Sequence, residues 1–242
     1  MNWHARYVQQ ANWTRELCEY LFDRTGLETG ERVLEVGCGT GAILSKIQTR
    51  SLHGLDIRPA SLMEARAHAP AASLTCGDAL SLPYPDKSFD ITFCHYLLLW
   101  VSDPQRALAE MKRVTGSGGY VLALAEPDYT ARVDKPAELA MLGRWQTESL
   151  HRQGADPSLG SRLAESFYEA GIELIETGAI ESQKDDAPTS AEWELEWAVL
   201  EADLAGFVPV DEIQRLKKLD ERAWAHGERI LHVPTYFAWG RV

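Results

Sequence analysis

The chain has 242 residues, of which 45% are hydrophobic and 25% are charged. These fractions are typical of a folded globular protein and exclude a disordered or fibrous chain. Acidic residues outnumber basic ones by 36 to 24, and the resulting net charge of -12 opposes binding to a phosphate backbone. We therefore expect one α/β domain with no nucleic-acid partner.

The four cysteines are widely separated and form no Cys-x-x-Cys pair, so we expect reduced thiols and no bound metal. The first residues lack a basic end followed by an apolar core. No stretch approaches the roughly 20 apolar residues of a membrane span. The expected location is cytoplasmic, without a membrane span.

The first half of the chain alternates strand and helix patterns. Residues 5–24 have the apolar spacing of one leading helix, and residues 32–36 form a short β-branched strand that ends at glycines. Helical spacing resumes at Ile43. Further strands are expected at 51–56, 72–76, 89–101 and 120–125, with helices at 59–68 and from Pro104 to Val114. Repeats of this kind predict a parallel sheet with helices on both faces.

The second half is less regular, and it contains no internal repeat. Its patterns predict helices at 136–153, 161–170, 191–204 and 211–225, and strands at 171–181 and within 230–242. A soft boundary lies near residues 127–136. We treat residues 1–242 as one domain, divided into a helical lid (1–29), a cofactor-binding core (30–126) and the substrate-side helices with the last two strands (127–242).

A glycine turn follows the first strand at Gly37, Gly39 and Gly41. Such a turn lets the backbone approach a ligand, and a helix behind it would offer free N–H groups. The glycine spacing is one residue tighter than in dinucleotide-binding turns. Asp56 ends the second strand, where a carboxylate can accept hydrogen bonds from a ribose diol. These residues predict a cofactor that contains a nucleoside.

The motifs resemble those of the class I S-adenosylmethionine-dependent methyltransferases. Within that family they are similar to the small-molecule branch (methyltransferase type 11), which includes ubiquinone and menaquinone biosynthesis methyltransferases. The resemblance covers roughly residues 30–126 and is carried by the segments 33–41, 55–57, 77–79, 88–91, 113–114 and 118–120. It implies a Rossmann-like, seven-stranded, mostly parallel sheet whose last strand is antiparallel, with S-adenosylmethionine as the cofactor.

The resemblance also implies a role for each cofactor residue. The glycine turn and Glu35 would face the methionine part, and Asp56 would hold the ribose. Ile57 would pack on the adenine, which Asp78 and the N–H of Ala79 would bind. The backbone near Cys94 would meet the methionine amino group. The implied cofactor-binding set is Glu35, Gly37, Gly39, Gly41, Asp56, Ile57, Asp78, Ala79 and Cys94.

Methyl transfer to a small organic acceptor, at O, C or N, is the implied activity. Alignment of two bound reactants can supply about 7–11 kcal/mol without an acid or base, so no catalytic residue is assigned. Side chains at strand ends and on nearby helices remain candidates for a general base. The candidates are His95, Tyr7, Tyr129 and His151. Tyr96, Glu126 and Asp128 are further candidates.

The acceptor pocket is expected between the leading helix and the helices of the second half. Trp145, Trp193 and Trp197 would form aromatic walls for a flat or greasy acceptor. On this interpretation the leading helix is a mobile lid, and Arg6 or Tyr7 approaches the methionine carboxylate when the lid closes. The alternative is a cofactor-binding module that moves no methyl group and acts as a sensor, a partner or a rearrangement catalyst. A nicotinamide-dependent oxidoreductase is disfavoured by the tight glycine spacing.

Overall fold

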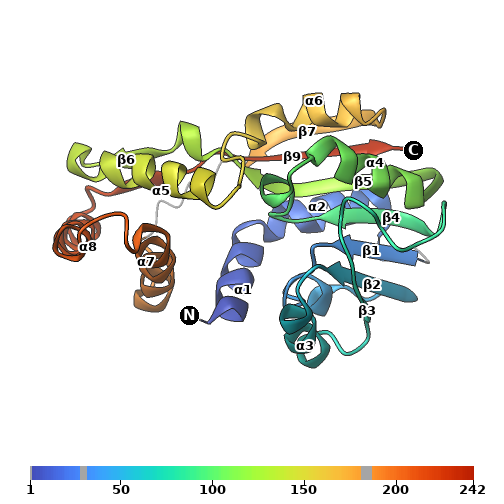
Figure 1. Cartoon of the computed structure of the whole chain (residues 1–242), viewed down its shortest axis with the longest axis horizontal. Coiled ribbons are helices and arrows are strands. Elements are labelled where there is room, and N and C mark those ends of the chain that lie inside the picture. The colour runs from blue at the N-terminus through green and yellow to red at the C-terminus, as the bar shows by residue number, and fades with distance from the viewer. Residues whose placement is uncertain (1, 28–31, 181–186) are drawn as a thin grey trace.

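The computed structural model describes residues 2–27, 32–180 and 187–242. Its centre is a seven-stranded sheet with the strand order β3-β2-β1-β4-β5-β9-β7 (Figure 1). The first five strands pair in parallel, whereas β9 runs antiparallel to both β5 and β7. The predicted Rossmann-like sheet with an antiparallel last strand is confirmed. Its strands are β1 (Arg32–Val36), β2 (Ser51–Asp56), β3 (Ser73–Cys76), β4 (Phe89–Cys94), β5 (Thr115–Pro127), β7 (Glu173–Ile180) and β9 (Thr235–Arg241).

Helices cover both faces of this sheet, because successive side chains of a strand point to opposite sides. Leu34 and Val36 of β1 belong to the core on the side of α4 (Pro104–Val114) and α6 (Leu163–Glu169). Val33 belongs to the core on the opposite side, with α2 (Arg15–Thr25) and α3 (Pro59–His68). α3, α4 and α6 begin and end close to the predicted residues, whereas α2 differs from its prediction.

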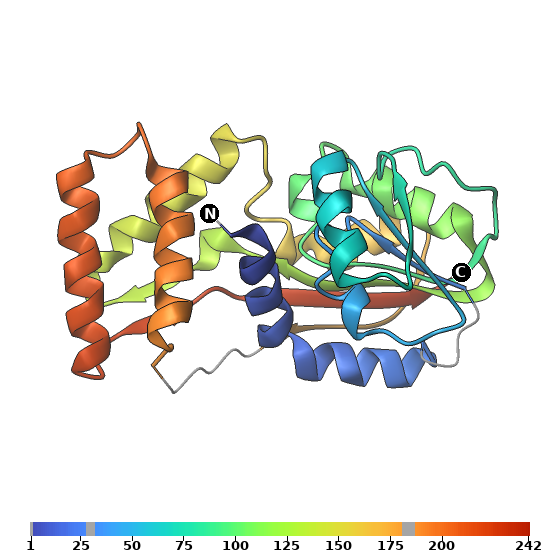
Figure 2. The same ribbon diagram turned by 90° about the horizontal axis from the view of Figure 1, so that it is seen from below.

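The leading helix is two helices, and the prediction of a single one was wrong. α1 (Trp3–Trp13) ends at Thr14, whose hydroxyl donates back to the carbonyls of Gln10 and Ala11. α2 then packs on the sheet through Cys18 and Leu21, and it ends at Gly26 in the left-handed conformation. Only α1 extends away from the sheet, and it lies between the sheet and α7 (Figure 2).

The helix expected behind the glycine turn is also absent, since residues 42–50 form only a 3-10 turn, η1 (Leu44–Lys46). The cause is the short connection from Gly41 to β2. A helix of this length would cover only about 14 Å, whereas the chain must return along about 20 Å to enter β2 at its far end. The connection is therefore mostly extended, and no helix N-terminus supports the turn.

The strand predicted over 89–101 ends early, at Cys94. Tyr96 has a positive φ of 52°, so the chain turns sharply there. The 3-10 turn η2 (Leu98–Trp100) follows and leads to α4. The continuous apolar run reflects burial of this loop, which periodicity alone does not distinguish from a buried strand.

The second half adds a helical cap beside the carboxyl end of the sheet (Figures 1 and 2). It contains α5 (Ala140–Arg152), α7 (Ser190–Leu204) and α8 (Val210–Ala225), and η3 (Tyr129–Ala131), η4 (Ala137–Leu139) and η5 (Gly160–Arg162) connect its parts to the sheet. The predicted helical pair is confirmed as α7 and α8. A small antiparallel sheet of β6 (Val133–Lys135) and β8 (Ile230–His232) was not predicted. The cap has its own apolar core, which includes Leu142, Trp197 and Leu216.

Candidate functional site

The glycine turn lies at the carboxyl end of β1, where ligands bind in open α/β sheets. Gly37 and Gly39 have φ values of 77° and 51°, which side chains rarely adopt. A Cβ on Gly37 would lie 2.7 Å from Leu97, and one on Gly39 would lie 3.2 Å from the ring of Tyr7. The turn, which we call the cradle, is therefore bounded by Leu97 of the loop after β4 and by Tyr7 of α1. Gly41 faces Ala65 and Ala69 of α3, so it serves helix packing.

Asp56 ends β2 beside this cradle and is 6% exposed. One carboxylate oxygen accepts the N–H of Gly39 at 2.8 Å, and the other accepts the N–H of Arg58 at 2.8 Å. The Arg58 side chain also lies 3.7 Å from the carboxylate. These contacts hold the carboxylate in one orientation. Each oxygen retains a further lone pair, so the group can still accept hydrogen bonds from a diol.

Glu35 precedes the turn, and its side chain is buried on β1. Its Oε2 atom has no hydrogen-bond partner among the residues that the structure describes. Burial raises the pKa of Glu35 well above its ordinary value, and the nearby charge of Asp56 raises it further. A buried acceptor without a partner is costly, and a ligand that brings a donor or a cation would satisfy it. The methionine ammonium group of the predicted cofactor fits this requirement.

The ends of β2 and β3 lie side by side, because Asp56 pairs with Cys76 in the sheet register. Ile57, just after β2, is 64% exposed. Asp78, just after β3, is exposed as well, and its carboxylate accepts the local N–H of Leu80 at 2.9 Å. An exposed apolar side chain near an accessible carboxylate fits a flat base with an amino group. Ala79 is buried behind Asp78, so only its backbone is suited to binding.

The loop after β4 is held by Glu126 at the end of β5. Its carboxylate accepts the backbone N–H groups of Leu97, Leu98 and Leu99 at 2.8–3.1 Å. Burial raises the pKa of Glu126 to about 7, although these three hydrogen bonds act to lower it. Glu126 thus positions the loop that forms one wall of the cradle. Cys94, before the loop, is fully buried, so its side chain belongs to the hydrophobic core.

The four candidate bases occupy different places. Nε2 of His95 lies 2.9 Å from the hydroxyl of Thr14, and burial lowers the pKa of His95 to about 3, which makes it a weak base. Burial raises the pKa of Tyr129 to about 12, so its hydroxyl stays protonated. Tyr7 lies over the glycine turn, and His151 is exposed on α5. The structure does not bring the four together.

Side chains of α1 contact both the cradle and the cap. His4 lies 2.8 Å from the hydroxyl of Thr40, and Tyr7 accepts a hydrogen bond from Arg58 at 3.0 Å. On its other side, Arg6 pairs with Glu196 of α7. Arg58 and Glu196 were not singled out from the sequence. Only the position of Arg58, two residues after Asp56, offered a signal for it.

The tryptophans expected to line an acceptor pocket instead stabilise the cap. Trp197 is 1% exposed, and the indole N–H groups of Trp193 and Trp197 both donate to Asp220, at 2.6 and 2.9 Å. Asp220 also accepts from Arg229 at 2.5 Å. These contacts show that both indoles pack within the cap and hold its helices together.

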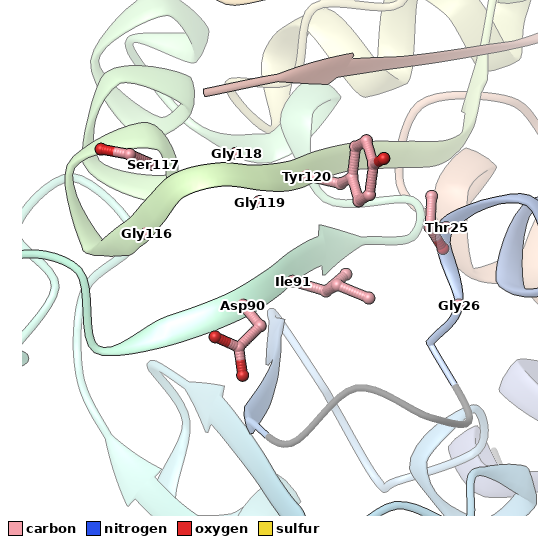
Figure 3. Close-up of a pocket in the computed structure, with 9 residues that line it drawn as sticks. All are labelled: Thr25, Gly26, Asp90, Ile91, Gly116, Ser117, Gly118, Gly119 and Tyr120. Carbon is pink, nitrogen blue, oxygen red and sulfur yellow. The ribbon is translucent and has the colours of Figure 1, made fainter.

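Two cavities in the described part of the chain lie outside the cradle. One, of about 340 Å³, lies at the amino ends of β4 and β5, between Asp90 and Tyr120, and so at the opposite edge from the cradle (Figure 3). The other, of about 330 Å³, lies between η3 and α5 and is lined by Tyr129, Arg144 and His151. The second cavity lies on the side of the cap, because α5 belongs to the cap.

Comparison with known proteins identifies the family of the chain. The family described as "Methyltransferase domain" matches residues 34–123, from β1 into β5. The malonyl-[acyl-carrier protein] O-methyltransferase of Halorhodospira halophila is 36% identical over 128 residues, which are 48% of this chain and 43% of that protein. The chain thus spans less than half the length of this relative. The aklanonic acid methyltransferase DauC of a Streptomyces species is 30% identical over 186 residues, which are 62% of this chain and 84% of that protein.

Among solved structures, the [4+2]-cyclase SpnF is 25% identical, with a TM-score of 0.60. The match covers 94% of this chain and 80% of that one. The resemblance to quinone-biosynthesis methyltransferases is confirmed by matches to demethylmenaquinone methyltransferases. The fold, the motif residues at one sheet edge and the extended match to DauC agree: the chain belongs to the S-adenosylmethionine-dependent methyltransferases.

Proposed function

We propose that this protein binds S-adenosylmethionine in the cradle and transfers its methyl group to a small organic acceptor. The observation that carries the proposal is the buried Oε2 atom of Glu35, which lies beside a glycine turn and an oriented Asp56 and has no partner in the described part of the chain. These residues fit the ammonium and ribose groups of the cofactor. The implied set stays as predicted, with Ile57 and Asp78 on the adenine side.

When bound, S-adenosylmethionine would supply a methyl group to a nucleophilic atom of the acceptor, and the electron pair of the broken bond would stay on sulfur, which leaves as S-adenosylhomocysteine. The protein positions the two reactants. Asp56 binds the ribose, Glu35 orients the methionine end, and Glu126 holds the wall formed by residues 97–99. α1 covers the turn through Tyr7 and excludes water. Positioning alone is worth about 7–11 kcal/mol, so the reaction needs no dedicated base.

The acceptor enters from the cap side. The curated relatives are named for acceptors as different as malonyl-[acyl-carrier protein], demethylmenaquinone and aklanonic acid, so membership of the family does not identify the acceptor. None of the helices in the described residues is long and apolar enough to cross a membrane. A cytoplasmic location and the absence of a nucleic-acid partner, which the net charge of -12 favours, remain proposals.

Cofactor binding is tested by isothermal titration of S-adenosylhomocysteine. We expect Asp56→Ala to lose about 1–3 kcal/mol of binding free energy, because a buried diol loses its acceptor. Asp211→Ala, at an exposed position of α8, is the matched control and should bind as the parent does. Absence of binding to the parent protein would refute the proposal.

A rearrangement catalyst that keeps the cofactor without using its methyl group is a second candidate. The observation in its favour is the match to the [4+2]-cyclase SpnF over 94% of this chain. A metabolite extract incubated with methyl-labelled cofactor separates the two functions. Label in a small product supports methyl transfer, whereas cofactor binding without any labelled product supports rearrangement.

A further inference from the structure

Arg6 of α1 is a buried arginine at the junction of α1, α7 and the sheet edge. The residue is 6% exposed, and its guanidinium lies 4.7 Å from the ring centre of Trp13. Its Nη1 atom donates to Gln9 at 2.9 Å and to Glu196 of α7. These contacts fix the plane of the guanidinium and balance its charge.

The other edge of the same guanidinium has no hydrogen-bond partner among the described residues. An arginine side chain also carries donors on Nε and Nη2. Neither atom donates to any residue in 2–27, 32–180 or 187–242. Neither is among the solvent-inaccessible polar atoms that lack a partner, so both reach accessible space. Two parallel N–H donors on an otherwise buried arginine match the two oxygens of a carboxylate.

Two tyrosines share the surroundings of this open edge. The guanidinium interacts electrostatically with Tyr129 of η3 and Tyr96 of the loop after β4, and both rings are half-buried. Burial raises the pKa of Tyr96 above its ordinary value and raises the pKa of Tyr129 to about 12. Both hydroxyls therefore stay protonated. The Tyr129 hydroxyl makes no hydrogen bond to the described residues, so it is a further available donor.

Arg6 lies between the cofactor cradle and the cap. Tyr7, the next residue, lies against Gly39 of the cofactor cradle. Neighbouring residues on a helix project about 100° apart. Arg6 accordingly contacts α7 and neighbours Tyr129, which also lines the 330 Å³ cavity beside α5. The expectation that Arg6 meets the methionine carboxylate is less consistent with this direction.

We propose that the open edge of Arg6 binds a carboxylate of the methyl acceptor, so that the substrate class is small organic acids. The proposal rests on the proposed function and names the acceptor for the same site. Glu196 and Gln9 are positioning residues, because they hold the guanidinium through Nη1 and leave Nε and Nη2 for the ligand. A carboxylate bound there is already ionised, which agrees with a site whose tyrosines are donors.

Two pairs of probes test the carboxylate and its source. With saturating S-adenosylhomocysteine, benzoate is compared with benzamide, which has the same shape without the charge. Separately, S-adenosylhomocysteine is compared with methylthioadenosine, which lacks the amino-acid part. Affinities are measured by titration for the parent, Arg6→Gln and Arg6→Lys. Arg15→Gln, at an exposed arginine of α2, is the control.

We expect the parent to prefer benzoate over benzamide by about tenfold or more, as for a charge-assisted hydrogen-bonded pair. Arg6→Gln should abolish this preference, Arg6→Lys should keep part of it, and Arg15→Gln should keep all of it. The preference for S-adenosylhomocysteine over methylthioadenosine should not change.

Failure has distinct forms. An unchanged benzoate preference in Arg6→Gln, or no preference or benzoate binding in the parent, would overturn the proposal. If Arg6→Gln instead loses the preference for S-adenosylhomocysteine over methylthioadenosine, Arg6 binds the methionine carboxylate, and this result would overturn the proposal as well. Failure of the parent to bind S-adenosylhomocysteine would count against the proposed function itself.

Discussion

The phenol oxygen of Tyr7 accepts a hydrogen bond from Nη2 of Arg58 at 3.0 Å. Arg58 in turn lies beside Asp56, so this bond joins α1 to the strand end that is expected to hold the ribose. The ring of Tyr7 rests on Gly39 at the same time. The position of α1 and the geometry of the cofactor site are therefore coupled.

Tyr7→Phe tests this coupling, because it keeps the ring over Gly39 and removes only the hydroxyl. We expect S-adenosylhomocysteine to bind about two- to tenfold more weakly, which corresponds to one solvent-accessible hydrogen bond. Tyr20→Phe removes a hydroxyl that contacts Glu176 far from the cradle, and it should bind normally. Isothermal titration measures both, and equal affinities for the two variants would exclude a role for the bond.

The lid prediction now applies to α1 alone, because α2 is part of the core. Binding of S-adenosylhomocysteine should slow hydrogen exchange of amides in residues 3–13, since the ligand adds contacts beneath a helix near the chain end. Amides of α2 should exchange at the same rate with and without ligand. If α1 shows no added protection, it is permanent structure and the lid prediction is wrong.

Glu126 should make the stability of the protein depend on pH. Its pKa is raised to about 7 in the folded protein from an ordinary value of 4.5, with burial as the main cause. Between these values the folded state binds more protons than the unfolded state, so the free energy of unfolding should fall as pH rises from about 4.5 to about 7. Above this window the dependence should level off.

Urea unfolding at pH values of about 5 and about 8 measures this effect. Glu126→Gln cannot titrate, so its free energy of unfolding should change less between the two pH values. Glu221→Gln alters an exposed carboxyl of α8 and should keep the slope of the parent. A slope that survives in Glu126→Gln must come from another group, such as Glu35, whose pKa burial also raises.

Asp220 should be essential for the stability of the cap. Asp220→Ala would leave two indole N–H groups without their acceptor and would remove one of the two carboxylates around the buried Arg229. Removal of one partner from a buried ion pair costs about 3–5 kcal/mol. Tryptophan fluorescence during urea unfolding reports the loss. Glu221→Ala, the next residue on the exposed face, should stay within about 0.5 kcal/mol of the parent.

The local pattern of the sequence determined the sheet and the cofactor edge. Alternation of strand and helix patterns, the turn at Gly37 and Gly39, and a carboxylate after β2 all lie within short segments. Their physical requirements are local: left-handed backbone needs glycine, and parallel strands need crossovers. That is why the parallel strands of the first half and the place of Asp56 at the end of a strand could be predicted from the sequence.

Only the tertiary structure decided what surrounds that edge. Arg6 and Glu196 are 190 positions apart in the chain, and Glu126 meets the backbone of residues 97–99 across the sheet edge. Trp193 and Trp197 are of a residue type that suits a pocket wall, but in the structure their indole N–H groups bind Asp220 within the cap. Contacts between residues far apart in the chain depend on how the helices and strands pack, and they produce no periodic pattern in the sequence of either segment. The residues of the cradle are thus encoded locally, whereas the surroundings of Arg6 exist only once α1 and the cap are packed against the sheet.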